Sequence, residues 1–370
     1  MPETRLDGVH HFTGVTADVT ANIDFWCRIL GLRFVKKTLN FETTFRYHPY
    51  YGDEQGHPGS VVTFLEFKEL EPGLPGNGNI QRIVLRVGSY DAAEYWLKRL
   101  AEQQVYSELL RLDPTRPTSL IFRDWEGHEV ELMVTDSTDA PQLAGADDIP
   151  EEFRIRGIEG ARSYAALEDT VPFGEHLGFA ADGERLVLAG EHRTARWYFS
   201  PPPGRPFQPL ATGVWHHMAL DAGDQLPQWR EYAAGGPIPF TQIFDHYFFD
   251  SCYSQSPGGI IELCTHGPGF TLDQTLEELG EGPVSLSPWT EPLRDKLERD
   301  LTPIVNPRSR LAAVQDAGAA GGNGVRDPDG RDGADGAAGD GRNGGEDGSA
   351  STRAADAAGP PIEQAAAVDG

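Results

Sequence analysis

Cysteine is scarce in this chain, and long apolar runs are missing. Three cysteines occur in 370 residues, at 27, 252 and 264, without the two-residue spacing of a zinc knuckle. Such a sparse, odd set argues against a disulfide framework, and we interpret Cys252 and Cys264 as small core residues. No apolar stretch approaches the roughly 18 residues that a membrane span needs. The N-terminal MPETRLDGVHH also lacks a basic, then apolar, signal region. We therefore expect a soluble, cytoplasmic protein.

Positive charge is also in short supply. The chain has 57 acidic residues against 31 basic ones, of which five are Lys, and its formal net charge is -26 at pH 7. A field this negative repels nucleic acid and anionic membranes, so neither is an expected partner. The remaining interpretation is a solvated acidic surface suited to a salt-rich, halophilic cytosol, where counterions screen self-repulsion.

The composition changes at about Leu311. From there to residue 370 the chain is mainly Gly, Ala, Asp and Arg, and it contains no aromatic residue. Such a segment cannot bury enough apolar area to offset its chain entropy. We therefore predict a disordered acidic tail over residues 311–370.

A strand, a helix and several strands recur four times before the tail. In the first expected helix, residues 18–30, Ile23, Trp26 and Leu30 fall on one face and Gly31 suits the C-terminal end. Further helices are expected at residues 90–102, 171–177 and 225–234. Strands are expected at residues 8–14, 32–41, 45–51, 61–67, 80–87, 128–134, 155–167, 185–189, 193–199, 213–219, 243–254 and 259–265, with helical or irregular packing at 276–300. The pattern predicts an α+β fold of four tandem βαβββ units in two domains. Units one and two form the first domain, residues 1–145, and units three and four form the second, residues 146–310.

Two His-His pairs carry the candidate chemistry, His10-His11 and His216-His217, each in the first strand of a unit. Adjacent side chains in a strand point to opposite faces, so one His of each pair can face a cavity while the other faces away. Glu262 lies in the last strand of unit four among apolar neighbours, where a carboxylate needs a partner. Two imidazoles and one carboxylate form the facial triad that leaves open positions on Fe(II). Hydrogen-bonded strand histidines are the alternative, but equivalent positions in repeated units favour a metal site.

Several segments resemble the ring-cleaving dioxygenases related to hydroquinone dioxygenases, in the vicinal oxygen chelate superfamily. The resemblance covers about residues 6–305 and is most specific in units one and four. It is carried by GVHHFT (residues 8–13), FWCRILGLRFVKKTLN (25–40), YHPYYGD (47–53), HPGSVVT (57–63), VWHHMA (214–219) and the segment 253–270.

The resemblance implies a role for eight residues. The family's metal ligands correspond to the second His of each pair and the strand Glu, which are His11, His217 and Glu262. The residues that surround the metal in the family correspond to His10, Thr13, His216 and Tyr253. The family's Arg seven residues before the tyrosine is His246 here, so we expect His246 to contact substrate and tune its choice. The loop before Glu262 is one residue shorter than usual.

The resemblance implies an Fe(II) enzyme, with Mn(II) as the alternative metal. It would insert O2 into a hydroxylated aromatic ring of the hydroquinone or catechol class, with His10, His216 or Tyr253 moving protons. A glyoxalase-type isomerase or lyase on the same fold stays open, and it would need a second Glu at the metal. A non-catalytic binding protein for quinones or xenobiotics also stays open, as does a homo-oligomer.

The same alignment of units predicts which units meet. Unit three has Arg162-Ser-Tyr164 where a ligand His would stand in a tandem site, so unit one must lie beside unit four.

Glu131, at the end of unit two, is the formal equivalent of Glu262 and the rival carboxylate. We interpret His48, in Tyr47-His-Pro-Tyr50, as part of a strand rather than of a pocket.

The charge excess generates a prediction about stability. Lowering the salt concentration from molar to about 0.1 M lengthens the Debye length from roughly 3 to 10 Å, so acidic groups repel one another more strongly. We expect a marked fall in the melting temperature of the chain over that range. A melting temperature that does not change with salt would contradict the halophilic interpretation.

Overall fold

The four predicted repeats organise the fold, which is α+β as expected. The computed structural model describes residues 2, 5–41, 43, 45–110 and 119–309. The predicted tail, residues 311–370, lies outside the described residues, so its disorder stays a prediction. The residues up to Arg310 cluster as one unit, and the division into domains 1–145 and 146–310 also stays a prediction.

The first two units share the order strand, helix and three strands. Unit one consists of β1 (Val9–Thr16), α1 (Val19–Ile23), the π-helix η1 (Asp24–Ile29), β2 (Arg33–Leu39), β3 (Tyr47–Gly52) and β4 (Val61–Glu66). Unit two consists of β5 (Ile80–Val87), α2 (Tyr90–Glu102), β6 (Ser107–Leu110), β7 (Ser119–Arg123) and β8 (Glu129–Val134).

The last two units repeat this order. Unit three follows the short η2 (Glu151–Phe153) and consists of β9 (Ile158–Tyr164), α3 (Leu167–His176), β10 (Ala180–Asp182), β11 (Arg185–Ala189) and β12 (Thr194–Ser200). Unit four consists of β13 (Trp215–Asp221), η3 (Gly223–Gln225), α4 (Leu226–Ala233), β14 (Phe244–Asp245), β15 (Phe249–Ser256) and β16 (Gly259–Pro268). Helices η4 (Phe270–Leu272), η5 (Glu291–Leu293) and α5 (Arg294–Asp300) follow.

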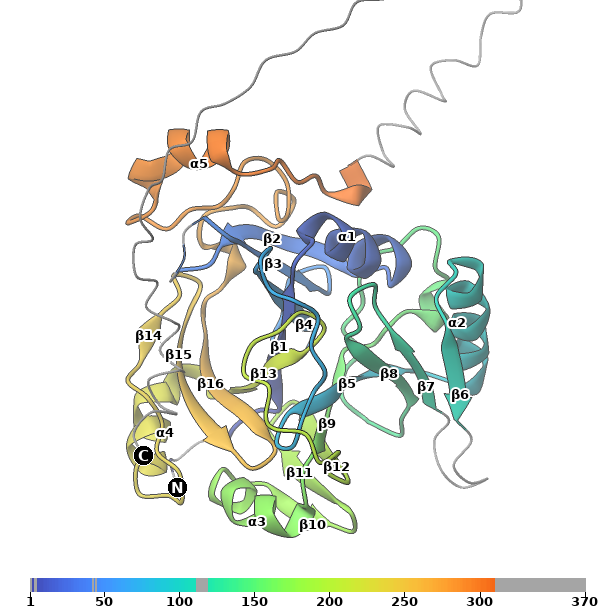
Figure 1. The fold of residues 1–370 in the computed structure, drawn as a ribbon, viewed down its shortest axis with the longest axis vertical. Coiled ribbons are helices and arrows are strands. Elements are labelled where there is room, and N and C mark those ends of the chain that lie inside the picture. The colour runs from blue at the N-terminus through green and yellow to red at the C-terminus, as the bar shows by residue number, and fades with distance from the viewer. Residues whose placement is uncertain (1, 3–4, 42, 44, 111–118, 310–370) are drawn as a thin grey trace, which may run out of the picture. The chain divides into compact units, whose positions relative to one another are not determined.

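Strand pairing joins the units in a fixed way. Within each unit the first and last strands pair in parallel: β1 with β4, β5 with β8, β9 with β12 and β13 with β16. Between units the first strands pair antiparallel, β1 with β13 and β5 with β9. Unit one therefore lies beside unit four, which confirms the prediction, and unit two lies beside unit three (Figure 1).

The two faces of the strands have different neighbours. Phe12 and Val62 pack with the helical residue Trp26 in the main hydrophobic core, while Val61 and Tyr50 belong to a second, smaller core. Because successive strand residues point to opposite faces, the adjacent Val61 and Val62 mark the two sides of one sheet. In units one and four the helices therefore cover one face, and the other face is left for the candidate site.

Helix α2 starts and ends where its periodicity predicts, and three expectations need correction. The predicted helix 18–30 begins as α1, with the Asp18 carboxylate accepting from two backbone N–H groups, and then widens into the π-helix η1. Helix α3 starts at Leu167, inside the stretch expected as a strand. The single strand expected over 243–254 is split into β14 and β15 by a turn in which Tyr247 has φ 73°. The sequence reading also missed the short strands β6, β7 and β10.

The segment after η4 runs along strand β2. The Ser285 N–H donates to the Lys37 carbonyl at 2.8 Å, and the Thr38 hydroxyl donates to the Ser285 carbonyl at 2.8 Å. Gly280 (φ 77°) passes so close that an added Cβ would meet the Phe34 carbonyl oxygen at 1.8 Å. This close approach fixes residues 286–290 over one end of the sheet, where they help to line the pocket described below. The helical or irregular packing predicted for 276–300 is thus confirmed, with η5 and α5 as its helical part.

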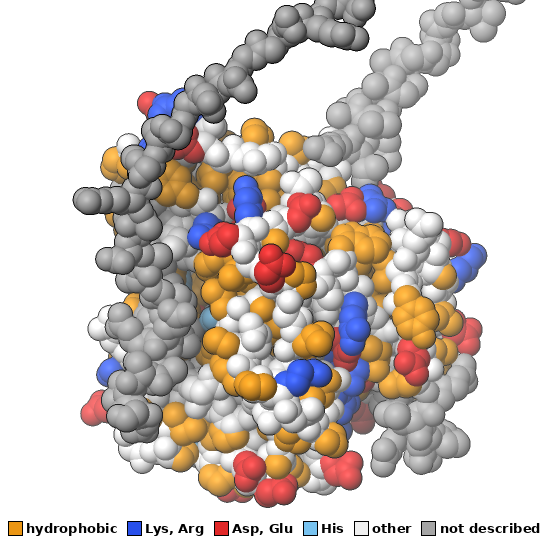
Figure 2. All heavy atoms as spheres, viewed as in Figure 1, with side chains coloured by type: hydrophobic (Ala, Val, Ile, Leu, Met, Phe, Trp, Pro, Cys, Tyr) orange, Lys and Arg blue, Asp and Glu red, His pale blue; other side chains and the backbone are white. Residues whose placement is uncertain are grey.

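Charged side chains on the face shown in Figure 2 are interspersed rather than gathered by sign, with hydrophobic side chains between them. Within the described residues, no helix is both long enough and apolar enough to span a bilayer.

Candidate metal centre

Both His pairs lie on the two strands that join unit one to unit four. In the β1–β13 ladder, His11 is opposite Ala219 and Thr13 is opposite His217. The register slips once on each strand: His10 is the extra residue on β1, and His216 is the extra residue on β13. A β-bulge places two residues opposite one and re-aims their side chains. Each bulge falls on the first His of a pair.

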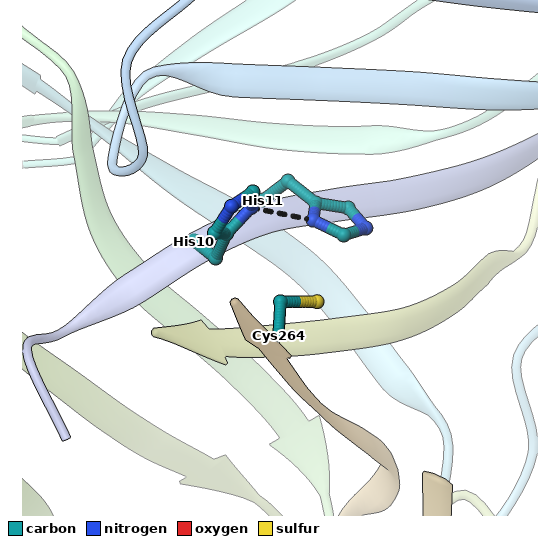
Figure 3. A group of neighbouring side chains, drawn as sticks. All are labelled: His10, His11 and Cys264. Carbon is teal, nitrogen blue, oxygen red and sulfur yellow. Dashed lines mark hydrogen bonds between the residues drawn. The ribbon is translucent and has the colours of Figure 1, made fainter. Parts of the chain in front are cut away.

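The structure corrects the expectation that the two His side chains of each pair point to opposite faces of the sheet. The Nδ1 atoms of His10 and His11 are 2.9 Å apart, and those of His216 and His217 are 2.7 Å apart. Figure 3 shows the first of these contacts, with both rings on β1. Strict alternation along a strand does not hold where a bulge interrupts the ladder, so the first His of each pair supports the second directly.

Three donor atoms converge where β1, β13 and β16 lie side by side. The Nε2 atoms of His11 and His217 lie 3.1 and 2.8 Å from Oε2 of Glu262 and 3.4 Å from each other. All three residues are at most 5% exposed. Apart from these two nitrogens, whose approach is not a well-formed hydrogen bond, neither Glu262 oxygen has a hydrogen-bond partner among the described residues. A buried carboxylate with so few hydrogen bonds is costly unless a cation compensates it, so the three ligand atoms fit a metal ion.

The protonation of this cluster suits metal binding. Burial alone would raise the pKa of the Glu262 carboxyl, but the imidazoles of His217 and His11 hold that pKa well below its usual range. Burial lowers the pKa of His217, although Glu262 opposes the shift. The favoured state is therefore an ionised carboxylate beside a neutral imidazole, which is the state that metals bind.

The preceding histidines can fix the tautomer of the cluster. Burial lowers the pKa of His10 and of His216 to about 3, so both rings are neutral at pH 7. Two Nδ1 atoms in contact share one proton. If the Nε2 atoms of His11 and His217 offer lone pairs to a cation, their Nδ1 atoms carry the protons and donate to His10 and His216.

A hydroxyl–imidazole network borders the cluster. The hydroxyl of Tyr253 lies 3.1 Å from Nε2 of His246, and Ser251 Oγ lies 3.0 Å from that hydroxyl and 2.8 Å from the same nitrogen. Tyr253 is opposite Glu262 in the β15–β16 ladder, and its ring contacts that of His217 at 5.5 Å. The buried Thr13 hydroxyl has no partner among the described residues.

A pocket adjoins this network, and sequence analysis missed part of its lining. His48 on β3 and His246 on the turn after β14 both line it, together with Trp289 of the C-terminal segment. The phenyl ring of Phe249, which does not itself line the pocket, contacts the rings of His246 and His11 at 5.3 and 5.4 Å, so it connects one pocket residue to the cluster. His48 is in a strand as expected, but it also lines the pocket, which corrects the expectation that it lies outside one.

Cys264 belongs to a second group of donor atoms. Its thiol, His10 and His11 offer atoms within 4.8 Å of one another (Figure 3). Burial, followed by the charge of Glu262, raises the pKa of this thiol well above its usual value. A protonated thiol is a poor ligand. Cys264 and Cys252 are both fully buried, in agreement with their predicted role as core residues.

The equivalent place between units two and three holds an ion-pair network instead. The Oε2 atom of Glu131 lies 3.4 Å from Nε of Arg82 and 3.5 Å from Nε of Arg162. The neighbouring Glu159 pairs with Arg86 at 2.6 Å. Guanidinium groups neutralise these carboxylates, so no further cation is needed there, and Glu131 is a natural control for Glu262.

Comparisons with known proteins agree with the fold. Residues 8–132 match the model of the Glyoxalase/Bleomycin resistance protein/Dioxygenase superfamily. A Bacillus subtilis (strain 168) protein provisionally named ring-cleaving dioxygenase MhqA is 33% identical, over 81% of this chain and 99% of its own length. The chlorohydroquinone/hydroquinone 1,2-dioxygenase of Sphingobium indicum is 26% identical, over 82% of this chain and 99% of its own length.

Solved structures give the same result. A protein of Bacillus subtilis subsp. subtilis str. 168 with a provisional dioxygenase assignment superposes with a TM-score of 0.73 at 26% identity, covering 82% of this chain and 99% of the other. The V278E mutant of glyoxalase I from Zea mays superposes with a TM-score of 0.50 at 12% identity, over 70% of this chain and 92% of the other, which shows the fold alone.

The chain therefore belongs to the glyoxalase/bleomycin resistance protein/dioxygenase superfamily, which confirms the resemblance seen in its motifs. Within that superfamily it is an enzyme of the ring-cleaving dioxygenase group, an oxidoreductase that incorporates O2.

The cluster predicts which variants lose metal. His11→Ala, His217→Ala and Glu262→Gln should each lose most of the bound divalent metal, because a three-donor site has no spare ligand. His10→Ala and His216→Ala should retain metal at saturating concentration and lose activity by roughly 10- to 100-fold, since they orient the donors. Metal analysis of the purified variants measures this.

Glu131→Gln is the matched control, because it changes the equivalent carboxylate of the other pair of units. It should leave metal content intact. If Glu131→Gln empties the protein of metal, or if His10→Ala does so while His11→Ala does not, the proposed ligand set is wrong.

Proposed function

We propose that this chain is an Fe(II)-dependent, extradiol-type dioxygenase that opens a hydroxylated aromatic ring of the hydroquinone or catechol class. The observation that carries the proposal is the convergence of His11, His217 and Glu262, where the Glu262 carboxylate is buried and makes no well-formed hydrogen bond within the described residues. The name of the Sphingobium relative, which acts on chlorohydroquinone and hydroquinone, supports the substrate class.

The donor chemistry favours iron. Two imidazoles and one carboxylate on one side of a metal leave adjacent positions open, which is the arrangement of non-haem Fe(II) oxygenases. Mn(II) remains the alternative, because it accepts the same ligands. When bound, the metal would act as a Lewis acid on a ring hydroxyl and hold the ring beside O2.

The chain's own residues have separate tasks in this proposal. His10 and His216 hold the imidazoles of His11 and His217 in the tautomer that presents Nε2. His246 shares a hydrogen bond with the Tyr253 hydroxyl, and burial lowers the pKa of His246 to about 4, so its ring is neutral at pH 7. A neutral imidazole next to a phenol can take a proton from a substrate hydroxyl and return it later.

The alternatives on the same fold fit less well. A glyoxalase-type isomerase would need a second Glu at the metal, whereas the cluster found among the described residues holds one carboxylate. A non-catalytic protein that only binds quinones or xenobiotics would not need three buried metal-ligand atoms that converge on one point. Cytoplasmic location and a homo-oligomeric state stay predictions.

Oxygen consumption tests the proposed activity. The chain, loaded anaerobically with Fe(II), should consume one O2 per ring opened when mixed with hydroquinone or catechol, and the ring absorbance should disappear in step. Parallel assays use Mn(II)-loaded protein and Glu262→Gln. Metal-replete protein that consumes no O2 with any catechol or hydroquinone would contradict the proposal.

His246 should tune substrate choice rather than hold metal. It contacts Tyr253 and lies against Phe41 at 4.2 Å between ring centroids. Replacing its neutral ring with the fixed charge of Arg should raise kcat/KM for anionic or halogenated rings relative to hydroquinone. Metal content should not change. Loss of iron in His246→Arg would mean that the ligand set is misassigned.

A further inference from the structure

We propose that Ser251 is a positioning residue for the proposed reaction. Its hydroxyl joins His246 to Tyr253 and fixes the direction of their hydrogen bonds, so that the Tyr253 hydroxyl offers its proton to the metal cluster. Ser251 then has a task in the site and does not merely fill space in the sheet. This inference rests on the proposed function and adds a residue to it.

Strand register places Ser251 on the face of the sheet that carries the cluster. Tyr253 is opposite Glu262 in the β15–β16 ladder, and Ser251 is opposite Cys264. Paired residues share a face, and so do residues two apart along a strand. Because Glu262 belongs to the cluster, both hydroxyls are on its side of the sheet. The tyrosine ring agrees with this placement, since it contacts the ring of His217 at 5.5 Å.

Three polar atoms form a triangle at this place. Ser251 Oγ lies 2.8 Å from Nε2 of His246 and 3.0 Å from the hydroxyl of Tyr253, whereas that hydroxyl lies 3.1 Å from the same nitrogen. The Ser251 side chain is fully buried, and within the described residues its hydroxyl has these two polar partners. The two shorter contacts make Ser251 the link between the imidazole and the phenol.

The number of protons allows two directions along this link. Burial lowers the pKa of His246 to about 4, so the ring is neutral at pH 7 and carries one proton, on Nδ1 or on Nε2. A proton on Nε2 is donated to Ser251, Ser251 donates to Tyr253, and the Tyr253 proton points out of the triangle. A proton on Nδ1 reverses the order: Tyr253 donates to Ser251, Ser251 donates to Nε2, and only lone pairs of the Tyr253 oxygen point outward.

The surroundings of Tyr253 favour the outward direction of its proton. Glu262, opposite it, is a buried carboxylate that makes no well-formed hydrogen bond within the described residues. An outward proton interacts favourably with this negative charge, whereas outward lone pairs would be repelled by it. The same direction leaves a lone pair on Nδ1 of His246, which lines the adjoining pocket. With metal in place, the Tyr253 proton is available to a substrate oxygen beside the cluster.

Without the Ser251 hydroxyl the direction is no longer fixed. The remaining contact, 3.1 Å between Nε2 of His246 and the Tyr253 hydroxyl, allows either atom to donate. A phenol that donates to the imidazole no longer offers its proton to the substrate. Because that proton matters most where negative charge develops on a substrate oxygen, its loss should lower kcat more than it raises KM.

A double-mutant cycle separates this role from a structural one. Its members are Ser251→Ala, Tyr253→Phe and their combination, each assayed with hydroquinone after anaerobic loading with Fe(II). The matched control is Ser254→Ala, because that serine is buried on the opposite face of the same strand and its hydroxyl donates to the Pro239 carbonyl at 2.9 Å.

A second measurement does not depend on activity. Heteronuclear NMR of the Zn(II)-loaded chain reports which nitrogen of each imidazole carries the proton. The signal that is missing in His246→Gln identifies the ring of His246. Zn(II) accepts the same imidazole and carboxylate ligands and is diamagnetic.

The wild-type ring of His246 should carry its proton on Nε2. Ser251→Ala should lower kcat about tenfold, as expected for one lost hydrogen bond to a developing charge, with KM and metal content nearly unchanged. In the Tyr253→Phe background the same change should have little further effect, because the serine acts through the phenol. Ser254→Ala should behave as wild type.

Three outcomes overturn the inference while the proposed function stands: a proton on Nδ1 of His246 in the wild-type chain, an equal loss of kcat from Ser251→Ala with and without Tyr253→Phe, or an unchanged kcat in Ser251→Ala. If Ser251→Ala does not fold, the NMR result on the wild-type chain decides. Metal-loaded wild-type protein that consumes no O2 with any catechol or hydroquinone would instead refute the proposed function.

Discussion

The antiparallel pairing of β1 with β13 is the constraint on which the candidate site depends. It brings together His11 and His217, which are 206 positions apart in the chain. The parallel pairing of β13 with β16 then adds Glu262, opposite Ala219. No unit contains all three donors, so the site exists only when the first and last units meet. Many backbone hydrogen bonds along the two ladders offset the entropy of closing so long a loop.

The two pairs of units compensate an equivalent buried carboxylate in different ways. Each buries a carboxylate at the equivalent place, Glu262 in β16 and Glu131 in β8. Guanidinium groups of Arg82 and Arg162 neutralise Glu131, whereas Glu262 faces the imidazole nitrogens of His11 and His217. A buried carboxylate needs compensation in either case. One pair of units therefore supports the fold with ion pairs, while the other leaves a place for a cation.

Much of the fold could be predicted from the sequence, because it depends on local periodicity. Helix α2 and strand β5 have the expected bounds, and the four repeats appear in the expected order. The meeting of units one and four followed from the position of Arg162 where a tandem site would need His. Helix α3 starts early, since tertiary packing of Phe173 and Thr170 outweighs the weak propensity of the segment.

The bulges and the pocket could not be predicted in this way. Alternation placed the two members of each His pair on opposite faces, but bulges at His10 and His216 bring the rings together. A bulge depends on the partner strand, and a single strand's pattern does not reveal it. Trp289 lines the pocket because its segment runs along β2, which Ser285 and Gly280 both contact closely. His48 has the pattern of an ordinary strand residue, and its open Nε2 becomes evident only in three dimensions.

The most direct test of the central claim is an anomalous difference map at the iron edge from anaerobic crystals loaded with Fe(II). Our account predicts one strong peak bounded by Nε2 of His11, Nε2 of His217 and a carboxylate oxygen of Glu262. A peak between His10, His11 and Cys264, or beside Glu131, would contradict it, as would crystals of iron-replete protein with no peak at this cluster.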